Sequence, residues 1–283
     1  MSRPAISEYL RPSSLEEAWQ RVSSGDPAVR LLSGGSDLTI SASPEVTTLV
    51  DIGGILDQGI EPDEDGSIRI GAGATLTAVL EHEALSSHAT GVVTEMMVHV
   101  GNPLLRNFAT MGGHLARGRL SDVVPVFVAL DAEVSLYRGS GPSDMALARY
   151  LDEHHNEQPH ILTGVVLPGL PGGSAAAFHR LSRTAFDFPI LNVCCRADGS
   201  AGQVGDVRIV CGATPRVAQR AGKAEALVVG AGLGDDTIET AARVAREEIA
   251  TGSGWVASAE YRSHLVEVLV ARCLQDVRER LTP

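Results

Sequence analysis

Apolar residues recur at helical spacing near the N-terminus and in short runs, separated by turns, along much of the chain. The segment 15–22 has apolar residues at i, i+3, i+4 and i+7 and follows two serines that can cap a helix, which predicts a first helix. Helical spacing predicts further helices over 75–85 and 92–100. Short apolar runs that end at turns predict strands over 28–32, 48–52, 67–70, 133–137 and 160–167. This mixture of elements indicates a protein with both helices and sheets.

A segment rich in proline and glycine, 168–173, separates this part from the last third of the chain. We predict a domain boundary there, followed by a smaller C-terminal domain. Its sheet is predicted to have three strands, over 175–181, 189–196 and 206–211, and helices are predicted over 237–249 and 261–281. Before the boundary, the segment 104–131 is rich in Gly, Asn, Thr and Arg. This composition predicts ordered loop backbone, with one buried helix or strand over 124–130.

Composition and charge limit the classes of function. The 283 residues have a formal net charge of −12 and 4% aromatic residues, which disfavours binding to nucleic acid or to an anionic membrane surface. Because no run of 18 apolar residues is present, we expect no membrane insertion. The four cysteines form no C-x-x-C pair, so we predict no metal site, free thiols and a cytoplasmic location. Cys194 and Cys195 are interpreted as buried packing residues.

Two glycine-rich turns are the candidate binding features. Ser33-Gly34-Gly35-Ser36-Asp37 follows a predicted strand, and Thr110-Met111-Gly112-Gly113-His114 lies in the predicted loop. Successive glycines can point backbone N–H groups into one concavity, where these bind phosphate without a lysine or arginine. Each turn alone is commonly only a tight turn. Together with the carboxylate of Asp122, which can accept from ribose hydroxyls or an adenine amine, they predict a dinucleotide site.

Other residues have competing structural interpretations. Ser121-Asp122 precedes an apolar run, so Asp122 is equally well interpreted as a helix cap. The glycines at 71–76 and 230–234 do not satisfy the Rossmann fingerprint. Arg180, Arg183 and Asp187 are typical of an ion pair at the entrance to a strand. No serine or cysteine is paired with a base at a recognisable spacing, so we predict no catalytic residue in this chain.

Seven segments of the chain follow one another in an order typical of one family. They are 9–18, 32–38, 70–76, 106–113, 121–122 with 129–132, 178–192 and 257–262. The chain thereby resembles the FAD-binding medium subunits of the molybdenum hydroxylases, the family that includes the carbon monoxide dehydrogenase medium chain and the xanthine dehydrogenase FAD-binding subunit. The resemblance implies an α+β fold with two FAD-binding subdomains of the PCMH (vanillyl-alcohol-oxidase-like) type, residues 1–56 and 57–170. A small α+β C-terminal domain, residues 174–283, is expected to follow.

The resemblance also assigns cofactor-binding residues, which are Leu32, Ser33, Gly34, Gly35, Ser36, Asp37, Leu38, Thr110, Gly112, Gly113, His114, Asp122, Leu162 and Arg180. The two turns are expected to hold the diphosphate and the ribityl chain, and Asp122 the ribose or adenine side. Leu162 and Arg180 are expected nearer the flavin and adenine rings. This chain departs from the common family pattern at Ser33 and Ser36, where Ala and Thr are common, at His114 (Asn) and at Arg180 (Lys). No histidine is identified as a covalent anchor, so the FAD is expected to be non-covalent.

Function and partners follow from the same resemblance. The chain is expected to be an oxidoreductase subunit whose FAD passes electrons from iron–sulfur clusters to NAD or another acceptor. The molybdenum cofactor is expected on a large molybdopterin-binding subunit and the [2Fe-2S] clusters on a small subunit, in a dimer of heterotrimers. Two alternatives stay open. One is a stand-alone flavin reductase on the same fold, and the other is a scaffold subunit that has lost FAD, which the departures at Ser36, His114 and Arg180 motivate.

Overall fold

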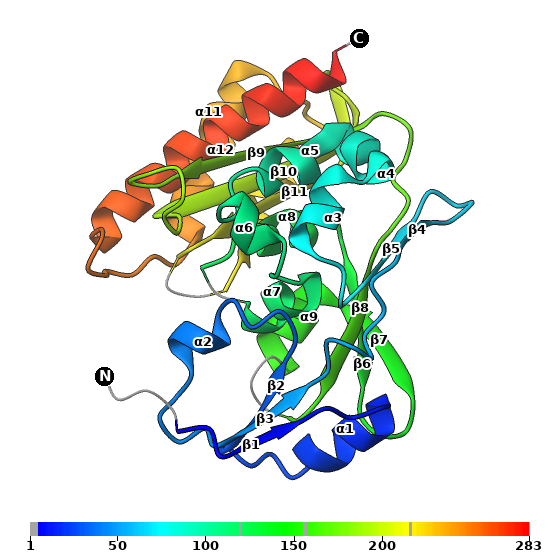
Figure 1. The fold of residues 1–283 in the computed structure, drawn as a ribbon. Coiled ribbons are helices and arrows are strands. Elements are labelled where there is room, and N and C mark those ends of the chain that lie inside the picture. Colours follow the sequence, from blue (N-terminus) through cyan, green and yellow to red (C-terminus); the bar gives the residue numbers. More distant parts are fainter. Residues whose placement is uncertain (1–4, 119, 155–157, 215–216, 283) are drawn as a thin grey trace.

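The computed structural model describes residues 5–118, 120–154, 158–214 and 217–282 of the chain. Three sheets succeed one another along the molecule, with the N-terminal sheet at one end and the long C-terminal helices at the other (Figure 1). Within these residues, no helix has the length and apolar character needed to cross a membrane. The predicted α+β fold with a separate C-terminal sheet and helices is therefore confirmed.

The N-terminal sheet is parallel and has the strand order β1-β3-β2, formed by β1 (Glu8–Leu10), β2 (Val29–Leu32) and β3 (Thr48–Asp51). Helix α1 (Leu15–Val22) connects β1 to β2, and the short helix α2 (Leu38–Ser41) follows β2. The predicted cap of α1 is present, because Ser14 Oγ accepts from the Glu17 backbone N–H and the Glu17 carboxylate accepts from Ser13. Parallel pairing places the turn that follows β2 at the carboxyl edge of this sheet.

The central sheet is antiparallel, with the order β4-β5-β8-β6-β7. Its strands are β4 (Ile60–Pro62), β5 (Ile68–Gly71), β6 (Glu133–Tyr137), β7 (Pro142–Ala146) and β8 (Ile161–Leu167). The helices between β5 and β6 are α3 (Leu76–Glu81), α4 (Glu83–Ser87), η1 (His88–Gly91), α5 (Val92–Met97), α6 (Pro103–Arg106), α7 (Met111–Arg117) and α8 (Val123–Ala129); α9 (Leu147–Arg149) and η2 (Tyr150–His154) follow β7. Most of the buried apolar residues of the first 170 positions form one core between this sheet and these helices.

The prediction of ordered loop backbone was wrong for residues 104–117, because α6 and α7 lie there, whereas α8 agrees with the buried helix or strand predicted over 124–130. Each of the first two helices begins at a polar cap: Asn102 accepts from the Leu105 N–H, and Thr110 from the Gly113 N–H. Met111 and Leu115 are fully buried, so packing holds a glycine-containing sequence in helical form. The helix predicted over 75–85 is interrupted at His82, whose backbone is extended.

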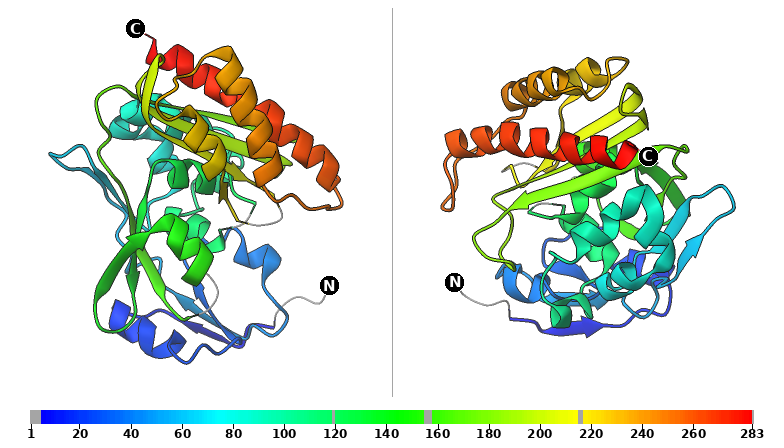
Figure 2. Two further views of the ribbon diagram at one scale, coloured as in Figure 1. Left: turned by 180° about the vertical axis from the view of Figure 1, so that it is seen from behind. Right: turned by 90° about the horizontal axis from the view of Figure 1, so that it is seen from above.

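The C-terminal domain has a four-stranded antiparallel sheet covered on one face by helices (Figure 2). The strands are β9 (Ser174–Leu181), β10 (Leu191–Ser200), β11 (Gln203–Gly212) and β12 (Gln219–Arg220), and the helices are α10 (Gly222–Val228), α11 (Asp235–Glu248) and α12 (Ala259–Leu281). The prediction of three strands missed β12, a two-residue edge strand too short to show a pattern. Cys194 and Cys195 are free and fully buried, as predicted; they belong to the cores on opposite faces of β10.

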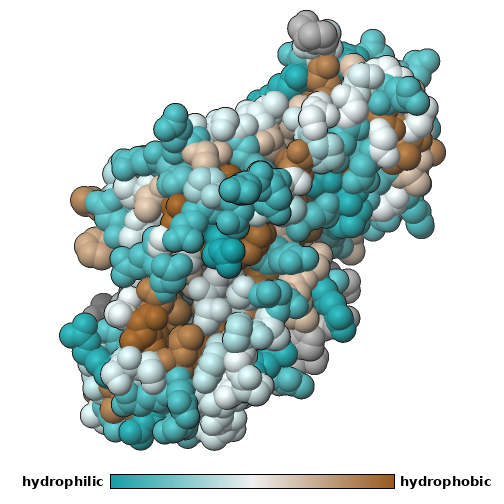
Figure 3. Space-filling model, turned by 90° about the vertical axis from the view of Figure 1, so that its right-hand side faces the viewer, coloured by the Kyte–Doolittle hydropathy of each residue, from teal (hydrophilic) through white to brown (hydrophobic). Residues whose placement is uncertain are grey.

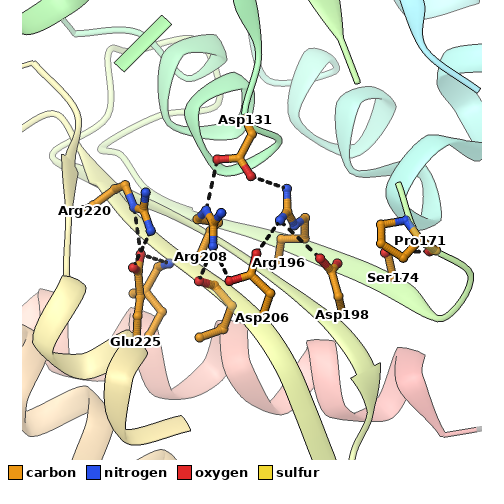
Figure 4. Close-up of polar contacts among 11 residues, drawn as sticks. Asp131, Pro171, Ser174, Arg196, Asp198, Asp206, Arg208, Arg220 and Glu225 are labelled. Atoms are coloured by element: carbon orange, nitrogen blue, oxygen red, sulfur yellow. Dashed lines mark hydrogen bonds and ion pairs between the residues drawn. The ribbon is translucent and has the colours of Figure 1, made fainter. Parts of the chain in front are cut away.

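The second face of the C-terminal sheet lies against helices of the central region, where α8 contacts both β10 and β11. A network of charged residues joins the two parts here (Figure 4). Arg196 binds Asp131 at 2.9 Å, Asp206 at 3.0 Å and Asp198 at 3.2 Å, and its side chain is only 4% exposed. Arg208 binds Asp131 at 3.0 Å and also contacts Asp206. This network ties the turn between α8 and β6 to the C-terminal domain and fixes their relative position.

Away from this contact, one side of the molecule presents a surface that is mostly hydrophilic, with a compact hydrophobic area in its lower part (Figure 3). Exposed aromatic side chains are few, as expected from the 4% aromatic content. The most exposed is Trp255, at 86%, followed by Phe108 and Phe186 at 66% and Phe188 at 58%. Phe186 and Phe188 lie beside the cleft described next.

Candidate functional site

A cleft of about 710 Å³ lies where the end of β2, helix α7 and the loop after β9 come together. Its walls include the turn 33–38, residues 99–101 after α5, the exposed side of α7, and Phe186, Asp187 and Phe188 from the C-terminal domain. The volume is within the usual range for small-molecule and cofactor sites, about 300–1,000 Å³. Segments far apart in the sequence thus form one concave site.

The turn 33–38 lines the cleft and contains backbone donors that no described residue pairs. No described residue accepts a hydrogen bond from the backbone N–H groups of residues 34–38. Gly35 has a φ of +68°, which the turn requires and glycine adopts without strain. At Gly34 a Cβ atom would lie 1.8 Å from the Phe108 carbonyl oxygen, so only glycine allows this close approach of the two backbones. A turn of this kind can serve as a backbone cradle for an anionic group.

The second glycine-rich segment is the first turn of α7, not a loop. Thr110 Oγ1 caps this helix at Gly113 and donates to Ser33 Oγ at 3.3 Å, which joins the two glycine-rich segments. Gly113 lines the cleft, whereas Gly112 is buried and its N–H binds the Ala72 carbonyl. A Cβ at Gly112 would lie 2.7 Å from that of Ala72. Gly112 therefore serves the packing of α7, and Gly113 is the glycine of this pair that is open to the cleft.

Asp122 lines the cleft and is held from behind by the C-terminal domain. Ser121, not Asp122, caps α8, because Ser121 Oγ accepts from the backbone N–H groups of the next two helical residues. Asp122 Oδ1 accepts from Asn192 Nδ2 at 2.7 Å and lies 3.4 Å from Arg180 Nε. Burial raises the pKa of Asp122 to about 6, although Arg180 and Asn192 act in the opposite direction.

Charged and aromatic side chains form the outer wall of the cleft. Arg117, at the end of α7, binds Asp37 at 3.0 Å and lies 4.7 Å from the centre of the Phe188 ring. His114 lies one turn earlier on α7, and burial together with Arg117 lowers its pKa to about 4. His114 is therefore neutral at pH 7.

Besides Gly112, two predicted residues do not line the cleft. Leu162 is buried in β8 and lies outside it. Arg180 lies behind Asp122, where its guanidinium also donates to the backbone carbonyls of Ala185 and Asp187. The ion pair predicted for this region is present between Arg183 and Asp187, at 3.2 Å. The remaining predicted residues all line the cleft. They are Leu32, Ser33, Gly34, Gly35, Ser36, Asp37, Leu38, Thr110, Gly113, His114 and Asp122.

Several residues of the site were missed by sequence reasoning. Phe186 and Phe188 had one usable signal, namely two aromatic residues close together in a chain poor in them. Arg117 is in the same motif as His114 but was not singled out. Asn192 had no local signal, because it lies on a buried strand 70 residues after Asp122.

The donors in the cleft fit FAD. Unpaired backbone N–H groups suit a diphosphate, a carboxylate suits hydroxyl or amine donors, and exposed apolar side chains suit planar rings. Ile40, Phe186 and Phe188 supply such apolar surface at the rim, with exposed fractions of 85%, 66% and 58%. Fold and cleft together define a flavin-binding protein that consists of a nucleotide-binding region and an added α+β domain.

Comparison with known proteins gives the family. Residues 4–170 match the model for the FAD binding domain in molybdopterin dehydrogenase, and residues 176–277 match the CO dehydrogenase flavoprotein C-terminal domain. The chain belongs to this family, which confirms the resemblance seen in its motifs.

Related sequences and structures extend along the whole chain. The xanthine dehydrogenase FAD-binding subunit of Escherichia coli O157:H7 is 26% identical and covers 96% of both chains. The nicotine 6-hydroxylase medium subunit of Paenarthrobacter nicotinovorans is also 26% identical, over 99% of this chain and 100% of that one. Solved structures of CO dehydrogenase from Oligotropha carboxidovorans and quinoline 2-oxidoreductase from Pseudomonas putida 86 share the fold. Their TM-scores are 0.88 and 0.86, at 24% and 23% identity, over at least 99% of each chain.

Proposed function

We propose that this chain is the FAD-binding electron-transfer subunit of a heteromeric molybdenum-dependent dehydrogenase. Its partners would be a large molybdopterin-binding subunit and a small [2Fe-2S] subunit, in a dimer of heterotrimers. The family model and the names of the full-length relatives support this assignment. We also propose a division into three parts, residues 1–56, 57–170 and 174–283, each of which has its own sheet. A cytoplasmic location is a further proposal, which the free buried thiols support.

The observation that carries the proposal is the backbone cradle at residues 34–38. In an acidic chain, residues 34–38 line a cleft that also includes Gly113, and their five consecutive backbone N–H groups have no acceptor among the described residues. We propose that this turn and Gly113 hold the diphosphate and ribityl chain, and that Asp122 accepts from the ribose or adenine side. Leu162 and Arg180 would act from behind the walls and not by direct contact.

The chain's own residues bind and position the cofactor. Bound FAD can take electrons singly and release them in pairs, which suits transfer from iron–sulfur clusters to NAD or another acceptor. Arg117 keeps the α2 side of the cleft close to α7 through its ion pair with Asp37. Neutral His114 adds no charge beside the diphosphate, so the cleft relies on backbone donors and Arg117 for attraction.

Flavin content tests the proposal directly. The purified protein should be yellow and should release FAD on denaturation, and Gly113→Val should lose the flavin while remaining folded. The fold tolerates a side chain there, because the nearest atom to a Cβ is Thr110 Oγ1 at 3.1 Å, but the side chain would enter the cleft. Gly54→Val is the matched control, since no atom lies within 4 Å of a Cβ at that exposed position.

Different outcomes separate the alternatives. A colourless wild-type protein that cannot be reconstituted with FAD would refute the proposal and favour a scaffold subunit. Unchanged flavin content in Gly113→Val would show that the cradle has been placed wrongly. Oxidation of NADPH by the isolated chain, dependent on a nucleotide sugar, would favour the stand-alone reductase. Purification from the native host, with analysis for molybdenum, iron and FAD, tests the partner subunits.

A further inference from the structure

Asn192 is fully buried on β10 of the C-terminal domain, yet its side chain reaches the cleft region of the preceding part of the chain. Its Nδ2 donates to Asp122 Oδ1 at 2.7 Å and to the Ser121 carbonyl at 3.0 Å. A Cβ at Gly212, on the neighbouring strand β11, would lie only 2.3 Å from Asn192 Oδ1. The amide therefore fits a space that only glycine leaves open, and its orientation is fixed.

The two oxygens of Asp122 have different surroundings. Oδ1 is bound by Asn192 and faces Arg180, while Oδ2 has no hydrogen-bond partner among the described residues and is not among the fully enclosed polar atoms. Since Asp122 lines the cleft, Oδ2 is the oxygen open to it. Asn192 thus holds one oxygen so that the other is presented to a ligand.

We infer that Asn192 is a positioning residue for flavin binding, which orients the Asp122 carboxylate so that Oδ2 accepts a hydrogen bond from the cofactor in the cleft. The inference rests on the proposed function and extends it, because it makes the C-terminal domain part of the FAD site. Binding of FAD and docking of the C-terminal domain then stabilise one another, since the same carboxylate takes part in both.

Asp122 is surrounded by few other charges. Arg180 from β9 is the nearest cation, and Asp187 and His99 are held close by backbone contacts with Arg180. On the cleft side the further ionisable residues are Asp37, His114, Arg117 and Asp187, of which Arg117 and Asp37 bind each other. The Asn192 amide is therefore the main neutral donor to Asp122, and its loss should raise the pKa of this carboxyl.

Asn192→Leu tests the inference, because leucine has the same branched shape and number of heavy atoms but no donor. We expect FAD binding about tenfold weaker at pH 8, or about 1.4 kcal/mol. We also expect the loss of affinity on acidification to occur at a higher pH than in the wild type. Asn192→Asp places a second carboxyl against Asp122 and should shift that pH further upward.

A control variant and a flavin-free measurement complete the design. Thr90→Val removes another hydrogen bond between the two parts, to the Ala176 carbonyl at 3.0 Å, and should leave the Asp122 titration unchanged. Carbon-13 NMR of the flavin-free protein, assigned with Asp122→Asn, gives the pKa of Asp122 without the cofactor. An unchanged Asp122 pKa in Asn192→Leu would overturn the inference whether or not FAD binds, whereas failure of the wild type to bind FAD would refute the proposed function itself.

Discussion

The ion pairs of the buried Arg196 give a prediction of stability that can be worked from the structure. Arg196→Leu removes three ion pairs at once, to Asp131, Asp198 and Asp206. Asp131 and Asp206 keep Arg208 as a partner. Asp198, whose side chain is 12% exposed, loses its cation. The destabilisation should therefore come mainly from one nearly buried carboxylate left without a partner.

Removing one partner of a buried ion pair costs about 3–5 kcal/mol, and a partly exposed pair contributes about 0–1 kcal/mol. Because Asp198 retains some contact with water, we expect the low end, about 3 kcal/mol. At about 2–4 °C per kcal/mol, the melting temperature should fall by about 6–12 °C. The assay is thermal unfolding followed by circular dichroism, with urea unfolding as a second measure.

Arg246→Leu is the matched control. Arg246 binds Glu267 at 2.8 Å, but the two side chains are 43% and 36% exposed, so the cost should stay below about 1 kcal/mol. If the melting temperature of Arg196→Leu lies within about 2 °C of the wild type, packing of the leucine stabilises the protein as much as the ion pairs do. The reasoning that this network fixes the C-terminal domain would then be refuted.

Two further predictions concern the cleft. Gly34→Ala should lower the flavin content and reduce the free energy of unfolding by about 1–3 kcal/mol, because the added Cβ meets the Phe108 carbonyl and forces the turn away from the segment before α7. Gly54→Ala should change neither quantity. Equal effects of the two substitutions would contradict the close approach. The second prediction concerns pH. The pKa of His114 is lowered to about 4, so the contribution of this residue to stability is lost as pH falls from 6.5 toward 4. The pKa of Asp122 is raised to about 6, so its contribution to stability is lost as pH rises from 3.8 toward 6. The free energy of unfolding, measured with urea at pH 5 and pH 7, should therefore fall less on acidification in His114→Asn than in the wild type. In Asp122→Asn it should fall more. Identical pH dependence in all three proteins would show that the pKa of neither group is perturbed.

Much of the fold could be predicted from local pattern. The helix α1, the strands β2, β3, β6 and β8 and the long helix α12 each carry a clear period of apolar residues or a cap in their own sequence. Residues 104–117 were wrongly predicted to be a loop, because glycine, asparagine and threonine are typical of loops when considered alone. In the structure the polar residues Asn102 and Thr110 cap helices. Burial of residues such as Met111 and Leu115 stabilises α7, whose sequence has a low helix propensity.

The sequence by itself determined the two glycine-rich segments, the acid at position 122 and the family to which their order belongs. Only the tertiary structure decided how each of these residues is used. Gly112 and Gly113 are neighbours of the same type, yet the N–H of one binds Ala72 and the other lines the cleft. Ser121 caps α8, and the Asp122 carboxylate instead accepts a hydrogen bond from Asn192 of the C-terminal domain. The physical reason is that hydrogen-bond partners and burial are set by residues distant in the chain, and no local pattern records them.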